Sequence, residues 1–353
     1  MAFLEVKNVR IAGIAAGVPD TIVRNSDGQV QSDNYDAEAF VESTGVVERR
    51  FTNYLTTGDL CYAAAEKLIS DLAWDKSEID AIIFVSQTHD YIEPATACIL
   101  QDRLGLSKEC YAEDLSMGCS GWVYGLSNAA SLVATGSFRK VILLAGEAKT
   151  KGVENDPLFG HAGTATALVY DEKAESLKFH FGTDGGGFDA IIIPDGGARN
   201  QFSMNSLKEE YIEGRIFNRT QTHMKGMDVF SFGISTAPKS IKKLSEHFGF
   251  NYQDCDYMLL HQANMKMNNF ILKKLKFDAG KAPSCMDKFG NTSSASIPLI
   301  IVTKLKGQKK CNLICCGFGV GLSWGTVAIV LDNAVISDLV EVSNDLSDNK
   351  YVV

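Results

Sequence analysis

The stretch Gly118-Cys119-Ser120-Gly121 has residue types and spacing suited to nucleophilic chemistry. It lies between a strand-like run, Tyr111 to Leu115, and a helix-like run, Trp122 to Thr135. At a helix start, unpaired N–H groups and the positive end of the helix dipole favour a thiolate over a thiol. The alternative is a structural cysteine, because free cysteines are among the most often buried residues. The turn alone leaves both interpretations open.

Two further residues complete a set that can perform acyl transfer. His261 directly follows the strand-like run Tyr257 to Leu260, and Asn291 follows Gly290 before a helix-like run. A cysteine sulfur can carry an acyl group while an imidazole and an amide donate hydrogen bonds to a thioester oxygen as negative charge develops. The simpler alternatives are a loop histidine for His261 and an ordinary helix N-cap for Asn291.

Alternating strands and helices are expected to position these residues. The apolar patterns predict an α/β fold with largely buried sheets. Strands are expected at 4–16, 82–86, 111–115, 141–145, 165–170, 257–260, 312–316 and 326–331, and helices at 37–43, 59–72, 96–104 and 122–135.

The same order of motifs occurs twice, which predicts two copies of one unit. The run 79–84 resembles 255–260, the glycine-bounded run 136–146 resembles 307–317, and 167–171 resembles 328–332. Gly118-Cys119-Ser120 resembles Gly290-Asn291-Thr292 in the same way. We therefore predict halves at 1–174 and 175–353, each directing a helix start at a shared crevice. We expect His261 to lie at the same crevice, because it follows the carboxyl end of a strand, where open α/β sheets place ligands.

The glycine-rich stretch Gly317 to Gly325 is predicted to be a tight hairpin. It superficially resembles a dinucleotide-binding motif, but a strand, Thr326 to Leu331, follows it in place of the helix that would bind a pyrophosphate. Glycines there allow backbone N–H groups to approach the site closely.

Composition narrows the class of protein. With 45% hydrophobic and 22% charged residues, the 353-residue chain has ample material for a core, and its apolar runs are too short to span a membrane. The net charge of −9 argues against general nucleic-acid binding. The nine cysteines form no CxxC pairs, so they fit neither a disulfide framework nor a zinc site, and we expect no metal. No export signal is visible, and free cysteines are typical of a reducing compartment, so we expect a cytoplasmic protein.

Four motifs in order resemble the β-ketoacyl-acyl-carrier-protein synthase III branch of the thiolase superfamily. They are Gly118 to Gly121, His261-Gln262-Ala263-Asn264, Gly290 to Pro298 and Gly317 to Gly325. The resemblance extends from Thr44-Gly45-Val46 to Leu331. It implies a five-layer αβαβα thiolase fold, a homodimer, and a decarboxylative Claisen condensation of an acyl group with a malonyl-acyl-carrier-protein thioester.

The resemblance also implies roles for individual residues. Cys119 would be the acylated nucleophile, and His261 and Asn291 would hold the malonyl thioester carbonyl while carbon dioxide leaves. The backbone N–H groups of Cys119 and Val320 would form an oxyanion hole. Phe318, with Phe230 and Glu93, is assigned to the substrate pocket. No tightly bound cofactor is implied, only phosphopantetheine thioesters of acyl carrier protein or coenzyme A.

Several positions depart from the family pattern. Phe40 to Ser43 replace a tryptophan and an arginine that grip coenzyme A, and Glu42 would repel its phosphate. Glu154 to Pro157 stand where another arginine is expected, and His161 replaces an aspartate. These changes favour an acyl-carrier-protein donor, or a specialised fatty-acid or polyketide pathway in place of general fatty-acid priming.

A lysine-rich helix after His261 is the predicted docking face for the acidic carrier. Lys266, Lys273 and Lys274 match the family's docking positions, opposite an apolar stripe of Met267, Ile271 and Leu275. An ordinary solvated lysine face is the alternative.

Two other functions also stay open. One is acyl transfer from Cys119 to a hydroxyl or amine. The other is a non-catalytic partner subunit of a heterodimer, but the presence of all the reactive residues argues against this second function.

Overall fold

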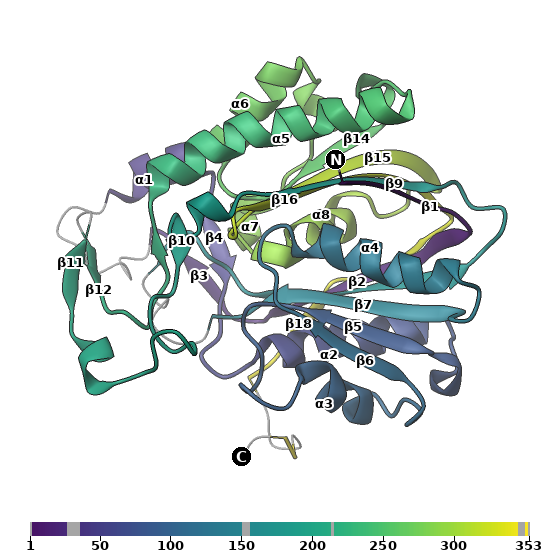
Figure 1. The fold of residues 1–353 in the computed structure, drawn as a ribbon, viewed down its shortest axis with the longest axis horizontal. Helices are drawn as coiled ribbons and strands as arrows, with labels where there is room; N and C mark the ends of the chain where they lie inside the picture. Colours follow the sequence, from purple (N-terminus) through teal and green to yellow (C-terminus); the bar gives the residue numbers. More distant parts are fainter. Residues whose placement is uncertain (1, 27–35, 150–155, 213–214, 345–349, 352–353) are drawn as a thin grey trace.

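The computed structural model describes residues 2–26, 36–149, 156–212, 215–344 and 350–351 of the chain (Figure 1). Two sheets and three layers of helices alternate, with α4 and α8 between the sheets, α2 and α3 beneath one and α5 and α6 above the other. The predicted αβαβα arrangement is therefore confirmed.

The first sheet has the strand order β17-β2-β8-β7-β5-β6, and β18 also pairs with β2. Its strands are β2 Val9–Pro19, β5 Ala81–Val85, β6 Tyr111–Leu115, β7 Lys140–Glu147, β8 Ala162–Tyr170, β17 Val335–Ile336 and β18 Val340–Val342. The second sheet has the order β1-β9-β16-β15-β14. Its strands are β1 Ala2–Val6, β9 Leu177–Thr183, β14 Tyr257–Leu260, β15 Lys310–Gly319 and β16 Ser323–Asp332.

The helices and the short strands outside the two large sheets complete the fold. The helices are α1 Ala37–Thr44, α2 Thr57–Asp71, α3 Thr96–Arg103, α4 Gly121–Ala134, α5 Gly226–Phe248, α6 Met265–Leu275, α7 Met286–Phe289 and α8 Ser296–Lys304. Three small antiparallel pairs join β3 Ile22–Arg24 to β4 Glu48–Arg50, β10 Ile191–Ile192 to β13 His223–Met224, and β11 Glu210–Ile212 to β12 Arg215–Phe217.

The duplication predicted from the sequence is present in the strand order. In the first sheet β8 is antiparallel to β7, which is parallel to β5. In the second sheet β16 is antiparallel to β15, which is parallel to β14. These are the three pairs of strands that the sequence motifs matched, so each half builds the same local sheet.

The two ends of the chain cross between the halves, which the sequence analysis did not foresee. The single strand expected at 4–16 is wrong: β1 pairs with β9 in the second sheet, and β2 pairs with β8 in the first. The chain changes direction between them at Asn8, whose φ is 62°. At the other end β17 and β18 return to the first sheet. A division at residues 174 and 175 falls between β8 and β9 and stays a prediction.

Helix α2 shows why the local patterns are reliable. Thr56 accepts a hydrogen bond from the Asp59 N–H at 3.2 Å and donates its own N–H to the Asp59 carboxylate at 2.8 Å, which forms a capping box. Leu60, Ala64 and Leu68, at helical spacing within the predicted helix 59–72, are fully buried against the sheet. Helix α5, the longest helix of the described chain, was not predicted from the sequence.

Candidate active site

Cys119 lies in the turn that joins β6 to α4, at the carboxyl end of its sheet. The N–H of Gly121 donates to the Gly118 carbonyl at 2.7 Å, which closes the turn. A Cβ at Gly118 would lie 2.4 Å from Val320 Cγ1 and 2.6 Å from Gln87 Oε1, so only glycine fits. The tight packing brings Cys119 to the boundary between the halves while the cysteine keeps some solvent access.

The hairpin between β15 and β16 packs directly on this turn, as predicted. A Cβ at Gly319 would lie 2.8 Å from Cys119 Sγ, so the missing side chain makes room for the sulfur. The Ser120 and Ser323 hydroxyls are 2.7 Å apart, and the Ser323 hydroxyl donates to the Val320 carbonyl at 2.8 Å. These contacts hold Val320 beside the nucleophile turn.

His261 enters the same crevice from the second half. Its N–H donates to the Cys316 carbonyl at 2.9 Å, which extends the β14–β15 pairing by one residue. Its Nδ1 lies 2.9 Å from the Ser296 hydroxyl, and the imidazole is near enough to Cys119 to lower the pKa of its thiol. Since Nδ1 is engaged by Ser296, Nε2 is the nitrogen left to act on Cys119.

The Ser296 hydroxyl can set the tautomer of His261. Its single proton has two acceptors in reach, the Ser293 carbonyl at 2.8 Å and His261 Nδ1 at 2.9 Å. When Ser296 donates to Ser293, Nδ1 must carry a proton and Nε2 presents a lone pair. When Ser296 donates to Nδ1, a neutral imidazole presents an N–H at Nε2. Rotation of one hydroxyl, together with exchange of the ring proton between Nδ1 and Nε2 through water, therefore changes what His261 offers the crevice.

Asn291 is held on both sides by backbone hydrogen bonds. Its N–H donates to the Leu158 carbonyl at 2.8 Å, and its carbonyl accepts from the Gly160 N–H at 3.1 Å. Its side-chain Oδ1 accepts the Ser293 N–H at 2.9 Å. The N-cap positions of the following 3-10 turn and of α8 are Thr292 and Ala295, so Asn291 is not a helix N-cap. The contact with Ser293 leaves the two Nδ2 hydrogens as the donors that the amide can offer.

Ser293 is a part of the site that the sequence analysis missed. Its hydroxyl lies 3.8 Å from Cys119 Sγ, and its backbone has a φ of 51°, which a non-glycine residue rarely adopts. Such conformations cluster at functional sites, where the surrounding contacts maintain them. The residue lies inside a motif quoted from the sequence, but nothing in the pattern marks its contact with sulfur.

The cysteines of this protein differ sharply in acidity. Burial raises the pKa of the Cys285 and Cys316 thiols to about 12. Burial acts in the same direction on Cys119, but the His261 imidazole, the Ser293 hydroxyl and the charge of Lys149 outweigh it and lower its pKa below the usual 9.0. Cys119 is therefore the thiol prepared to react as a thiolate.

The three residues assigned to the substrate pocket lie in different parts of the structure. Phe318 is buried and meets the His261 ring edge to face, with centroids 5.6 Å apart. Phe230 packs against Phe270 between α5 and α6, with ring centroids 5.7 Å apart. Glu93 is exposed in the loop that leads into α3.

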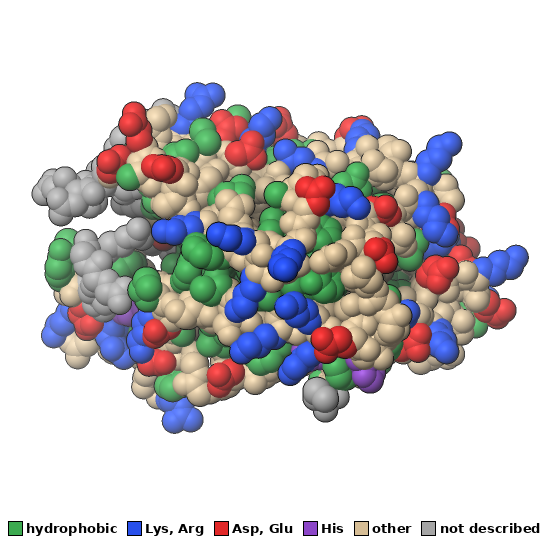
Figure 2. All heavy atoms as spheres, turned by 90° about the horizontal axis from the view of Figure 1, so that it is seen from above, with side chains coloured by type: hydrophobic (Ala, Val, Ile, Leu, Met, Phe, Trp, Pro, Cys, Tyr) green, Lys and Arg blue, Asp and Glu red, His purple; other side chains and the backbone are tan. Residues whose placement is uncertain are grey.

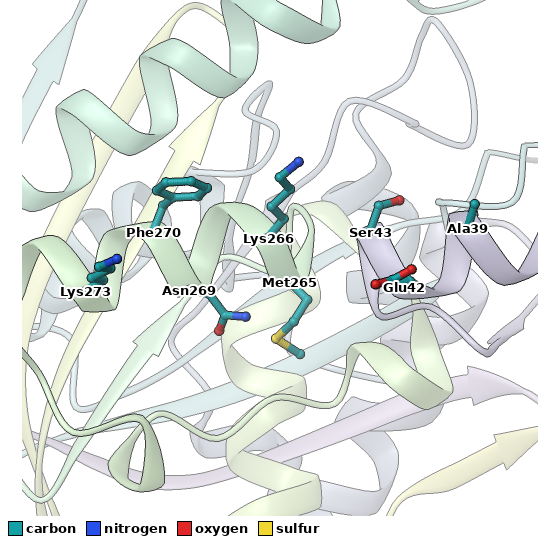
Figure 3. Close-up of a pocket in the computed structure, with 8 residues that line it drawn as sticks. All are labelled: Ala39, Glu42, Ser43, Met265, Lys266, Asn269, Phe270 and Lys273. Atoms are coloured by element: carbon teal, nitrogen blue, oxygen red, sulfur yellow. The ribbon is translucent and has the colours of Figure 1, made fainter.

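The lysines of α6 border a groove between α1 and α6, shown in Figure 3. Lys266 and Lys273 line it together with the exposed Phe270, and Glu42 faces it from α1. The groove has a volume of about 510 Å³.

Lys274 lies outside the lining of this groove and approaches the Ile234 carbonyl at 3.4 Å. Seen from the side of α5 and α6, basic side chains gather around apolar ones (Figure 2). The apolar stripe Met267, Ile271 and Leu275 is buried beneath, as predicted.

Of the departures from the family pattern, His161 is visible and residues 154 and 155 lie outside the described part of the chain. His161 is 1% exposed, and its Nδ1 accepts the Thr52 N–H at 3.3 Å. Burial, with the charge of Arg49, lowers its pKa to about 3, so the imidazole is neutral at physiological pH.

Within the described residues no cluster of metal-binding side chains occurs. No helix there is long and apolar enough to cross a membrane.

The layered fold, with His261 beside Cys119 and Asn291 in the turn that carries Ser293, is typical of a thiolase-fold condensing enzyme. Residues 113–185 match the family model for 3-oxoacyl-[acyl-carrier-protein] synthase III, and residues 245–331 match that for its C-terminal part.

Whole-chain comparisons agree with the family models. Proteins named β-ketoacyl-[acyl-carrier-protein] synthase III from Desulfitobacterium hafniense and Clostridium acetobutylicum are each 31% identical over 332 residues. The matches cover 91% and 92% of this chain and 97% and 99% of those proteins. The chain therefore belongs to the β-ketoacyl-acyl-carrier-protein synthase III family, an enzyme family, as the sequence motifs predicted.

Solved structures support the same assignment. The 3-oxoacyl-(acyl-carrier protein) synthase from Burkholderia xenovorans superposes with a TM-score of 0.90 at 35% identity, over 97% of this chain and 99% of that one. The corresponding synthase III from Pseudomonas aeruginosa has a TM-score of 0.80 at 26% identity, over 93% and 100%. The predicted thiolase-like fold is confirmed.

Proposed function

We propose that this chain condenses an acyl group carried on Cys119 with a malonyl-acyl-carrier-protein thioester, with loss of carbon dioxide, to give a β-ketoacyl thioester. The observation that carries the proposal is the meeting of a thiol of lowered pKa with His261 from the other half. A nucleophile of this kind suits acyl transfer because the thiolate attacks thioesters readily.

Acylation uses the lone-pair form of His261. The Cys119 thiol gives its proton to Nε2, and the sulfur attacks the thioester carbonyl while the N–H groups of Cys119 and Val320 stabilise the oxyanion. The bond from carbonyl carbon to the carrier sulfur breaks, and the carrier thiolate takes the proton back from His261. Ser296 accepts from Nδ1 throughout this step.

Condensation uses the opposite tautomer. The imidazole first exchanges protons with water, so that Nδ1 loses its proton and Nε2 gains one, and Ser296 turns its own proton to Nδ1. Nε2–H and the Asn291 amide then donate to the malonyl thioester oxygen. The bond to the carboxylate carbon breaks, carbon dioxide leaves, and the electron pair enters an enolate stabilised by the two donors. The enolate carbon attacks the acyl carbonyl on Cys119, a carbon–carbon bond forms, and the sulfur leaves as a thiolate. One proton from water then restores the thiol that began the cycle.

The partner is an acyl carrier protein, and the groove between α1 and α6 is its docking face. Lys266 and Lys273 suit an acidic partner, with Lys274 beside them, while Glu42 makes the same groove unfavourable for a phosphate of coenzyme A. We further propose a homodimer that works in the cytoplasm, with thioester substrates and no tightly bound cofactor. These elements rest on the family resemblance.

Mass spectrometry of the intact protein tests the nucleophile. Incubation with acetyl, butyryl and longer acyl thioesters of carrier protein and coenzyme A should add one acyl mass at Cys119. The variant Cys119→Ala should lack it, whereas Cys98→Ala, at an exposed free cysteine, should retain it. Absence of an adduct with every donor would favour the partner-subunit alternative. Release of the loaded acyl group to a hydroxyl or amine, without carbon dioxide formation from malonyl carrier, would favour simple acyl transfer.

A further inference from the structure

Lys149 lies at the active crevice although no motif marks it. Strands β6, β5 and β7 are parallel neighbours, with Val85 paired to both Leu115 and Ala145, so their carboxyl ends meet at one edge. Cys119 follows the end of β6, and Lys149 follows the end of β7. Because one strand separates them, the two strand ends lie about 10 Å apart. A four-carbon acyl chain spans roughly half of that distance.

The ammonium group of Lys149 lies over the ring of Phe159. Its Nζ lies 4.6 Å from the centroid of the Phe159 ring and 3.4 Å from the Thr222 hydroxyl. The Phe159 backbone forms a bridge with Asn291, so the ring under the ammonium belongs to the segment that holds the catalytic amide. The lysine charge also acts on the Cys119 thiol, as its lowered pKa indicates.

Within the described residues, no carboxylate forms an ion pair with this ammonium group. Lys149 is half-buried, and its Nζ contacts a hydroxyl and an aromatic ring. A carboxylate at position 161 would face it, but this chain has the neutral imidazole of His161 there, and the Lys149 backbone contacts that ring. A partly desolvated cation without an anion is costly, and an anionic ligand would remove that cost.

We infer that Lys149 binds the terminal carboxylate of the acyl group loaded on Cys119, so that the preferred first substrate is a short ω-carboxyacyl thioester. This inference rests on the proposed acyl loading of Cys119. The malonyl carboxylate is a poorer occupant, because a cation that held it would stabilise the ground state against decarboxylation. The acyl chain, in contrast, keeps its far end throughout the reaction.

Paired donors of equal chain length test the inference. Loading of Cys119 is followed by mass spectrometry with succinyl-pantetheine and butyryl-pantetheine, in the wild type, Lys149→Met, Lys149→Arg and the control Lys7→Met, at an exposed lysine outside the groove. We expect the wild type to load succinyl at least tenfold faster than butyryl. Lys149→Met should reverse the order, Lys149→Arg should retain it, and Lys7→Met should match the wild type.

The ratio of the two rates separates substrate binding from activation of the thiol. Loss of the lysine charge lowers the thiolate fraction for both donors equally, so a ratio that is unchanged in Lys149→Met overturns the inference even if both rates fall. Alkylation of Cys119 by iodoacetamide, read on its peptide, gives an independent measure of a reactive thiol. If the thiol alkylates but neither donor loads, the proposed acyl loading itself is wrong. If butyryl alone loads, acyl loading stands and the carboxylate inference fails.

Discussion

The turns around Cys119 and Asn291 occupy equivalent places in the two halves but treat the following helix start differently. Ser120, the N-cap of α4, makes no capping bond with its side chain, and its hydroxyl instead contacts Ser323 of the other half. The start of α4 therefore keeps its positive end for a thiolate, an effect of about 0.3–1 kcal/mol. In the second half Asn291 binds the Ser293 N–H, and Ser296 bonds the Ser293 carbonyl.

This difference teaches how one duplicated scaffold supports two kinds of chemistry. The first turn leaves donors open and stabilises a negative sulfur. The second turn satisfies its backbone with its own side chains and thereby fixes the orientation of an amide and an imidazole. Fixed donors act well on developing charge, since they need no reorganisation at the moment of reaction. A substitution in one turn should thus impair the reaction step that this turn serves and leave the other step in place.

The largest expected effect comes from the second turn. Asn291→Ala removes a donor to the malonyl thioester, so carbon dioxide release from malonyl carrier should fall by about 10²–10³-fold. Acyl loading of Cys119 should persist, because it does not use the amide. The measurement pairs a carbon dioxide assay with mass spectrometry, and Asn205→Ala, at an exposed position, is the matched control. Unchanged decarboxylation would remove Asn291 from the mechanism.

The first turn should fail in the opposite manner. Gly319→Ala places a Cβ 2.8 Å from Cys119 Sγ and 2.7 Å from its Cβ, which displaces the nucleophile. We expect acyl loading to fall by about 10–100-fold, since small misplacements of reacting groups have effects of this size. Gly197→Ala, where no atom lies within 4 Å of the added carbon, controls for helix and turn propensity. Loading at the wild-type rate in Gly319→Ala would show that the sulfur tolerates the contact.

The coupling between the turns is visible in the acidity of the thiol. His261→Ala removes the group that most strongly opposes the effect of burial, so the pKa of Cys119 should rise. The thiolate exists above the pKa, so the pH midpoint of iodoacetamide alkylation should move upward, and the rate at pH 7 should fall about tenfold for each unit of that rise. The wild-type midpoint should lie below 9.0. Coincident pH profiles of the two proteins would contradict the effect of the His261 imidazole on the Cys119 thiol.

The smallest effect is expected away from both turns. Lys266→Glu reverses a charge in the groove between α1 and α6. It should slow condensation with acyl carrier protein several-fold at low salt, and the difference should shrink as salt screens the encounter. Lys7→Glu, at an exposed lysine outside the groove, should have no such effect. Equal slowing with free pantetheine thioesters would indicate a structural defect in place of lost docking.

Much of the fold was predictable because its signals are local. The stripe Leu60, Ala64 and Leu68 and the capping residues Thr56 and Asp59 are neighbours along one helix, and β5 and β14 are continuous apolar runs. The crossing of β1 into the sheet of the second half was not predictable, because the pairing of β1 with β9 joins residues far apart in the chain. The turn at Asn8 that permits it is a single residue with positive φ.

By itself the sequence determined which chemistry is available: a cysteine before a helix, a histidine after a strand, an asparagine in a matching turn, and glycines where the halves approach. Only the tertiary structure decided what these groups do to one another. The Ser293 hydroxyl near the sulfur, the Ser296 contact with Nδ1 and the placement of Lys149 over Phe159 depend on segments brought together by packing. Distances of a few ångströms between such segments set the pKa of a thiol, and sequence spacing does not contain them.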